Sequence, residues 1–197
     1  MAPWCFHSAD RLVRDSALDC SSVKSGFRIK GVFEDNGCSI VLGSDPVKAV
    51  YGEAYVEKLI DARSYDAMAT LGAHIEAAAP LPGEPALGLP IPLFVYVEAL
   101  TWLAQSVRSG AWTYFEATPL LRQEAMCQGL AQLGGELFMG WYCFGMRHWM
   151  DSSRMRELDH WLDESEQVQE AWLASLLDSH RARVKELLCA RIEQVVG

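Results

Sequence analysis

Residues 80–92, with the sequence PLPGEPALGLPIP, hold five of the chain's eight prolines. Proline lacks the backbone N–H that helix interiors and central strands need, so no regular element can cross this segment. The segment therefore predicts an extended linker or a strap across the surface. We expect it to divide an N-terminal part, residues 1–79, from a C-terminal part, residues 93–197, either as two units or as two layers of one compact domain.

The N-terminal part combines strand and helix signals. Two β-rich runs flank Asn36-Gly37, a pair that accepts the positive φ angles of a tight turn, and they predict a small β-hairpin. Residues 8–18 are expected to form a short helix. From residue 47 to residue 79 the apolar spacing becomes helical, with Ser64 as an N-cap.

The C-terminal part has helical spacing throughout. The expected helices cover residues 93–109, 119–133 and 136–150, one helix beginning at residues 151–153, and a last one running from a capping pattern at residue 163 towards residue 195. The run 136–150 is apolar on nearly all sides, with Gly140 and Gly145 as close-packing points, so it is predicted to be the buried central helix. The fold class is mostly α (α+β), with a small N-terminal β-hairpin and helices followed by a bundle of about five helices.

Composition limits the possible partners. Half of the residues are apolar, and seven are Trp, which is enough for a packed core. The formal net charge of −9 disfavours nucleic acid and anionic lipid and favours a basic partner. Charged residues interrupt the first twenty positions, and no apolar run is long enough to cross a bilayer, so a cytoplasmic location is expected.

No motif for metal binding or catalysis stands out. The six cysteines are scattered without a C-x-x-C pair, and reduced thiols are expected. His148 with Asp151, or Asp159 with His160, matches no metal-ligand spacing. Cys143 and His148 are poorly spaced for a thiolate–imidazole pair on one helix, so Cys143 is expected to be a core residue. The sequence thus predicts no catalytic residue, no metal and no cofactor.

The connection between the first two helices of the bundle is unusually aromatic. Trp112, Tyr114 and Phe115 are followed at once by Glu116, where a turn is normally small and polar. One interpretation is that Trp112 and Phe115 plug the core between the helices. The other is that Trp112, Tyr114 and Glu116 are exposed and anchor a basic partner.

The same stretch carries a family resemblance. Residues 109–115, SGAWTYF, resemble the N-G-G-F-x-x-Y-F element of a bacterial family that includes acidic DNA-mimic proteins, without the Asn and the second Gly and with one residue fewer before Tyr-Phe. The sequence LAQLG at residues 130–134 resembles the leucine-rich helix end that follows the element in that family. The match covers about residues 93–135. It implies a helical fold and a small cytoplasmic protein of toxin–immunity neighbourhoods.

An acidic stripe lies near the C-terminus. Residues 157–178 contain seven acidic residues and no Lys or Arg. Four of them are spaced four, three and four apart, and in one continuous helix they would share about 60° of arc: Asp159, Asp163, Glu166 and Glu170. Such a face is either simply solvated or docks a cationic partner, since like charges at this spacing repel one another weakly.

These observations favour a non-catalytic, acidic binding protein. The leading hypothesis is an immunity protein that neutralises a cognate bacterial toxin by occluding its basic active site, with the four acids of the stripe, Trp112, Tyr114 and Glu116 as contact residues. One alternative is a small hydrolase or transferase, which a buried titratable group in a sizeable pocket would favour. Another is a DNA-mimic regulator, which requires two roughly parallel rows of acids. The sequence does not determine the oligomeric state.

Overall fold

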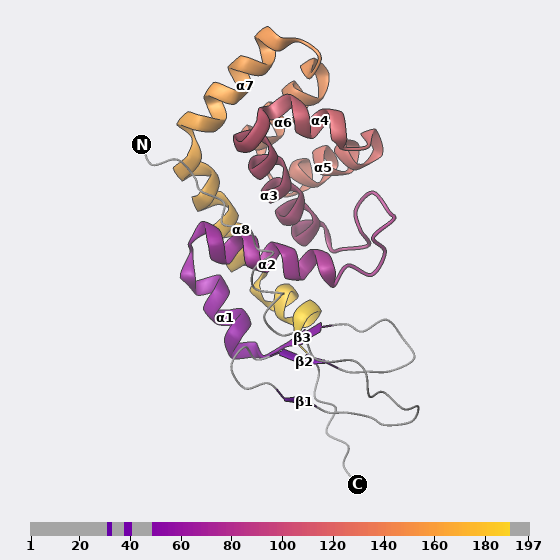
Figure 1. The fold of residues 1–197 in the computed structure, drawn as a ribbon, viewed down its shortest axis with the longest axis vertical. Coiled ribbons are helices and arrows are strands. Elements are labelled where there is room, and N and C mark those ends of the chain that lie inside the picture. The colour runs from indigo at the N-terminus through magenta and orange to yellow at the C-terminus, as the bar shows by residue number, and fades with distance from the viewer. Residues whose placement is uncertain (1–30, 33–37, 41–48, 190–197) are drawn as a thin grey trace, which may run out of the picture.

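Helices make up most of the molecule, a computed structural model that describes residues 31–32, 38–40 and 49–189 (Figure 1). The prediction of a mostly α fold is confirmed for these residues. In chain order, the helices of this part are α1 (Glu53–Ala62), α2 (Tyr65–Ala77), α3 (Ile91–Ser109), α4 (Ala111–Ala117), α5 (Leu120–Gln132), α6 (Glu136–His148), α7 (Ser152–Glu164) and α8 (Glu166–Leu188).

Three short strands form an antiparallel sheet in the order β1-β2-β3. They are β1 (Gly31–Val32), β2 (Cys38–Ile40) and β3 (Ala49–Tyr51), and they lie where α1 begins and α8 ends (Figure 1). A backbone bridge between Tyr51 and Cys189 connects β3 to the end of α8. The sequence predicted a helix from residue 47, but residues 49–51 form strand β3 and the helix α1 begins only at Glu53.

Two N-terminal predictions lie outside the described residues. These are the hairpin turn at Asn36-Gly37 and the helix over residues 8–18. The N-cap of α2 is confirmed, since the Ser64 hydroxyl accepts a hydrogen bond from the Ala67 N–H at 3.3 Å.

The central helix of the core is α3. Eleven of its nineteen residues are buried, and it contacts α2, α4, α5, α7 and α8. The prediction that residues 136–150 form the central helix is wrong. Helix α6 packs against α4, α5 and α7 through Phe138, Tyr142 and Gly145, whereas Leu137 on its other side is 52% exposed. An all-round apolar pattern indicates burial only where neighbours surround the helix.

Residues 80–90 of the proline-rich segment form a loop of turns and bends. The Leu81 N–H donates to the Leu87 carbonyl at 3.1 Å, which closes a turn of residues 81–87. Leu87 and Leu89 are buried and belong to the hydrophobic core. That core contains residues from both sides of the loop, from Val56 on α1 to Leu188 on α8.

The aromatic connector is itself a helix, α4, and this adds a sixth helix after residue 90 to the five that were expected. Gly110 separates α3 from α4 with a φ of 87°, a value that residues with a Cβ rarely adopt. Thr118 and Pro119 then lead into α5, and the buried Gln123 side chain donates to the Phe115 and Thr118 carbonyls at 2.9 and 2.7 Å. The chain therefore forms a short helix, α4, where an aromatic turn was expected.

The helices α7 and α8 meet at a corner. Asp151 caps α7 by accepting from the Ser153 and Arg154 N–H groups, within the predicted start at residues 151–153. The last helix does not begin at Asp163, which lies inside α7 because the chain turns only at Ser165. The buried Gln169 side chain holds this corner by donating to the Leu162 carbonyl and to Ser165 Oγ, both at 2.8 Å.

Ion pairs fasten α8 to α1. Arg181 contacts Glu57 and Asp61, and Lys185 contacts Glu57 at 2.8 Å. Hydrogen bonds from Lys185 and then from Arg181 hold the pKa of Glu57 below its usual value. Arg181 and Lys185 of α8 are thus paired with acids of α1. No helix of the described part is both long enough and apolar enough to cross a membrane.

The glycines of α6 provide a matched test of this packing. A methyl group at Gly145 would overlap the Phe115 ring and lie 2.8 Å from Leu158 Cδ2, whereas one at Gly140 would meet no atom within 4 Å. We expect Gly145→Ala to destabilise the fold by about 1–3 kcal/mol through overpacking. Gly140→Ala should stabilise it by about 0.5–1 kcal/mol through helix propensity. Urea denaturation of both variants measures the difference, and equal effects at the two positions would contradict this packing.

Candidate functional site

The acidic stripe is divided by the corner at Ser165. Asp159 and Asp163 lie on α7, and Glu166 and Glu170 lie on α8. The sequence left open whether this segment is one helix or breaks near Asp163, and the structure has the break at Ser165, so the four acids belong to two helices. Asp163 and Glu166 are exposed, whereas Asp159 and Glu170 are half-buried.

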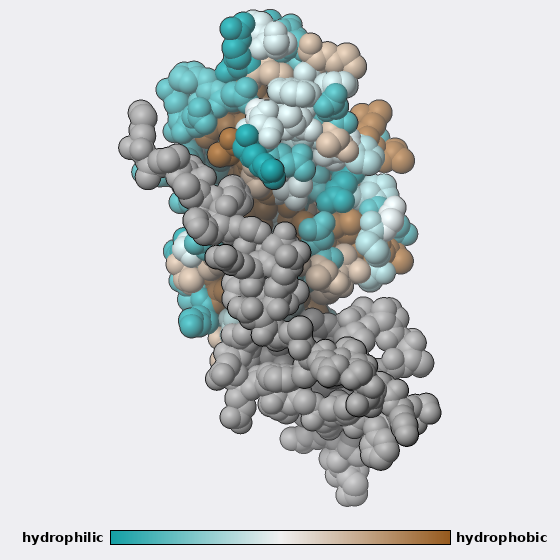
Figure 2. All heavy atoms as spheres, viewed as in Figure 1, coloured by the Kyte–Doolittle hydropathy of each residue, from teal (hydrophilic) through white to brown (hydrophobic). Residues whose placement is uncertain are grey.

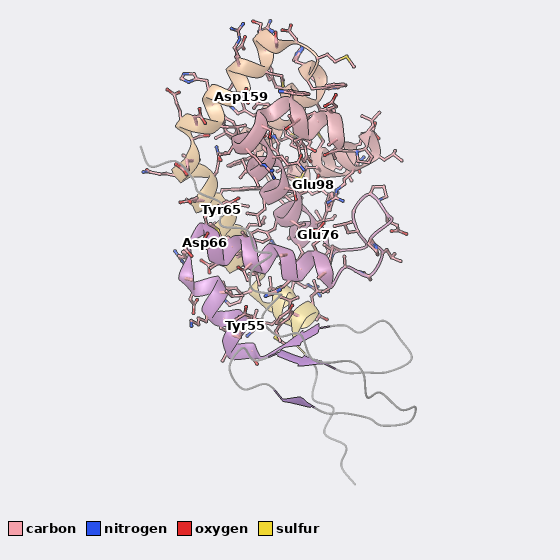
Figure 3. All side chains as sticks on the ribbon, in the orientation of Figure 1. Tyr55, Tyr65, Asp66, Glu76, Glu98 and Asp159 are labelled. Carbon is pink, nitrogen blue, oxygen red and sulfur yellow. The ribbon has the colours of Figure 1, made fainter. Side chains whose placement is uncertain are left out.

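Asp159 has a structural contact that its sequence position does not indicate. Its Oδ1 accepts the Ala111 N–H at 2.7 Å and so caps the first turn of α4 (Figure 3). The residues are 48 positions apart, so no local pattern predicts the bond. Asp159 therefore helps to position the aromatic helix, and the surface acids beside the corner are Asp163, Glu166 and Glu170.

The predicted aromatic anchors separate into buried and exposed side chains. Tyr114 is fully buried and Phe115 is 2% exposed, so both belong to the core. Trp112, expected in the first interpretation to be core, is 44% exposed. Glu116 is also exposed. Of the three proposed anchors, Trp112 and Glu116 are accessible to a partner, and Tyr114 is not.

An apolar groove lies beside the α7–α8 corner, between the C-terminal half of α3 and the start of α8. Its cavity volume is about 40 Å³. Its floor is mainly hydrophobic and its rim carries two carboxylates; the lining residues are Tyr65, Leu103, Ala104, Val107, Glu166, Gln169, Glu170 and Leu173. Burial, and then the charges of Asp66 and Glu170, raise the pKa of Tyr65, whose position beside α8 is marked in Figure 3. The groove was not predicted, because it forms only where α2, α3 and α8 meet.

Val107 extends the groove towards the exposed Trp112. It is 52% exposed on the last turn of α3, one turn before Gly110. A Cβ at Gly110 would lie 3.2 Å from Trp112 Cδ1 and 3.8 Å from Asp159 Oδ2, so Trp112 and Asp159 flank this glycine. Figure 2 shows that apolar side chains also reach the surface among hydrophilic ones on one face of the molecule. This mixture of apolar and acidic groups suits protein recognition.

A second polar cluster is enclosed in the core. Glu98 of α3 is 1% exposed, and its carboxylate accepts the Tyr114 hydroxyl and, at 2.6 Å, the Arg122 Nε–H (Figure 3). The Tyr142 hydroxyl then donates to the Tyr114 oxygen, 2.7 Å away. Burial is the main cause of the raised pKa values of Tyr114 and Tyr142. The cluster does not line the groove, and each of its members has a partner, so its contacts serve to hold the core together.

A third cluster surrounds His74. Its Nδ1 lies 2.8 Å from the Tyr51 hydroxyl and its Nε2 3.2 Å from the Tyr55 hydroxyl. The Tyr51 ring also packs on the imidazole, with centroids 4.1 Å apart. Burial lowers the pKa of His74 below its usual value. A neutral imidazole can donate from one nitrogen and accept at the other, so it serves both tyrosines.

The structure also shows the contacts of the histidine, aspartate and cysteine residues that the sequence analysis considered for metal binding or catalysis. Asp151 is occupied as the cap of α7, and His160 Nε2 faces Glu164 at 3.3 Å. Cys143 lies beside Cys127 of α5. Within the described residues no three His, Cys, Asp or Glu side chains converge as metal ligands.

Comparison with known proteins identifies no relative. No protein-family model, curated protein or solved structure matches the chain. The family resemblance over residues 109–115 and 130–134 therefore stays a prediction.

Breaking the buried Glu98–Arg122 ion pair should cost more stability than breaking an exposed ion pair. We expect Arg122→Gln to destabilise the protein by about 3–5 kcal/mol, because it leaves the Glu98 carboxylate buried without a counter-charge. Arg154→Gln, which breaks the exposed Arg154–Glu157 pair, should cost less than about 1 kcal/mol. The double variant Glu98→Gln/Arg122→Gln should regain part of the loss. Urea denaturation tests this, and equal costs at Arg122 and Arg154 would refute it.

The His74 cluster predicts a pH dependence of stability. Since the folded pKa of His74 lies below its unfolded value, the unfolded chain takes up the proton first as the pH falls. The stabilisation is therefore complete above the unfolded pKa of about 6.5 and is lost as the pH falls from there towards the folded pKa. We expect His74→Gln to flatten the decline in urea midpoint between pH 7.5 and 5. His160→Gln, at an exposed site, should retain the wild-type slope, and the same slope in His74→Gln would rule out this role for His74.

Proposed function

We propose that this chain is a non-catalytic binding protein that covers the basic active site of a partner, in the manner of an immunity protein that neutralises a bacterial toxin. The observation that supports this most directly is the apolar groove between α3 and α8 with Glu166 and Glu170 at its rim. A lysine or arginine side chain would complement both parts, because its aliphatic stem can lie along the apolar residues while its charge meets the carboxylates.

Within the described part of the chain, the distribution of internal ion pairs leaves the acids of this surface free for a partner. Acids on α1 are neutralised by Arg181 and Lys185, and Asp178 on α8 pairs with Arg63 and Arg181. Among the described residues, Asp163, Glu166 and Glu170 have no basic side chain within ion-pair distance. Unneutralised negative charge beside an apolar groove favours both rapid encounter with a basic protein and a specific contact.

Two exposed residues of α4 would extend the contact. Trp112 presents about half of its surface next to Gly110, and Glu116 is exposed on the same helix. Tryptophan is enriched among residues that dominate binding energy at interfaces. The immunity role itself, and a cytoplasmic location, rest on the net charge of −9 and on the family resemblance at residues 109–115.

The alternatives have less support. A hydrolase or transferase would use a titratable group within a pocket, but the buried Glu98 is enclosed by Arg122 and Tyr114 away from the groove. A DNA mimic would present a second row of free acids. The row at Glu53, Glu57 and Asp61 on α1 is instead paired with Lys185 and Arg181.

The proposal predicts how charge removal changes partner association. The partner to test is the protein encoded beside this gene, and association is followed by stopped-flow fluorescence over a range of salt concentrations. Glu166→Gln/Glu170→Gln should slow association several-fold at low salt and weaken its salt dependence, because steering depends on local charge.

The matched control changes the net charge equally at a distance from the groove. Glu124→Gln/Glu136→Gln removes two exposed acids on α5 and α6 and should leave the association rate near that of the wild type. If both double variants slowed association equally, the groove would lose its role. Absence of any complex with the neighbouring gene product would remove the immunity proposal.

A further inference from the structure

Two cysteines from neighbouring helices meet at the surface of the α5–α6 pair. Cys127 lies on α5 and Cys143 on α6, and their Sγ atoms are 2.8 Å apart. Both residues are half-buried, and both are free thiols. The two helices pack directly on each other across the short connection at Gly134-Gly135.

This separation is suited to a covalent bond between the sulfurs. A disulfide has an S–S distance of about 2.05 Å, so each thiol needs to move by only a fraction of an ångström. The same separation is too short for a shared metal ion. Two thiolates on one tetrahedral zinc each lie about 2.3 Å from it at an angle of about 109°, which places them about 3.8 Å apart, farther than the 2.8 Å seen here.

We propose that Cys127 and Cys143 form a site of reversible oxidation, at which hydrogen peroxide converts the two thiols into a disulfide between α5 and α6. Reduction by a small thiol restores both cysteines. The site is separate from the groove and its acids, and the proposal does not depend on the partner-binding function.

The reaction proceeds in two balanced steps. Cys143 Sγ attacks a peroxide oxygen, an S–O bond forms as the O–O bond breaks, and the product is a sulfenic acid and water. Cys127 Sγ then attacks the sulfur of Cys143, the S–S bond forms as the S–O bond breaks, and a second water leaves. The two thiols lose two electrons and two protons, and peroxide is reduced to two waters.

The neighbouring charges favour Cys143 as the attacking thiol, because Arg147 lies one helical turn after Cys143 on α6, whereas Glu124 lies one turn before Cys127 on α5. Burial, and then the hydrogen bond and charge of Cys143, raise the pKa of the Cys127 thiol, which keeps it protonated and a poor first nucleophile. The other charged groups that act on it are Arg147 of α6, which lowers the pKa, and Glu124 of α5, which raises it. Cys127 is therefore the resolving thiol, held in contact with the sulfur that oxidises first.

Peptide mapping of the full-length protein tests the proposal directly. Both cysteines lie within one tryptic fragment, residues 123–147, because no Lys or Arg intervenes between Arg122 and Arg147. The folded protein is treated with hydrogen peroxide, alkylated under denaturing conditions, digested without reduction and analysed by mass spectrometry. We expect this fragment to lose two hydrogens and to take up no alkyl group. Reduction before alkylation should restore two alkyl groups.

Single substitutions distinguish the two roles. In Cys127→Ser, the sulfenic acid on Cys143 should persist and be trapped by dimedone. In Cys143→Ser, Cys127 should remain a thiol and be alkylated. Cys189→Ser, at the third described cysteine, should form the disulfide as the wild type does. The proposal is overturned if the wild-type fragment keeps two alkylated cysteines after peroxide treatment, or if either cysteine is found linked to a different fragment.

Discussion

The structure depends on one buried charge. The carboxylate of Glu98 lies within the central helix α3 and is bonded to Arg122 of α5 and Tyr114 of α4, which in turn accepts from Tyr142 of α6. A carboxylate without such partners would cost several kcal/mol in this environment. Four helices must therefore approach Glu98 in one arrangement, and the apolar side chains around it pack within that constraint.

The proposed binding surface follows from this arrangement. Because α3 is fixed from several sides, its last turns present Leu103, Ala104 and Val107 along a defined line. The facing helix α8 kinks at His180, so the ion pairs of Arg181 to α1 hold the part after the kink, and Gln169 holds the start of the helix. Glu166 and Glu170 thus project from the start of α8, which Gln169 anchors, and a rigid support of this kind lowers the entropic cost of binding.

Parts of the candidate site were readable from the sequence because they depend on local chemistry. Glu166 and Glu170 stood out as acids without nearby basic residues in the chain, and both line the groove. Asp159 belonged to the same pattern, yet its carboxylate caps α4, since a residue 48 positions away supplies the N–H. Tyr114 and Trp112 share one short helix, and only its packing against α3, α6 and α7 determines that Tyr114 is buried and Trp112 exposed.

The sequence alone determined the helical class, the cap at Ser64, the helix end at residue 109 and the helix start at residues 151–153, because each rests on hydrogen bonds or φ angles within a few residues. The tertiary structure decided which helix is central. Helix α6 has one packed side, where Gly145 faces Phe115, and one open side, where a Cβ at Gly140 would meet no other described residue within 4 Å, so α6 is not surrounded by other helices. It also decided which acids face solvent and which thiols meet. Burial and pairing are properties of neighbours, and residues distant in the chain become neighbours only when the whole fold forms.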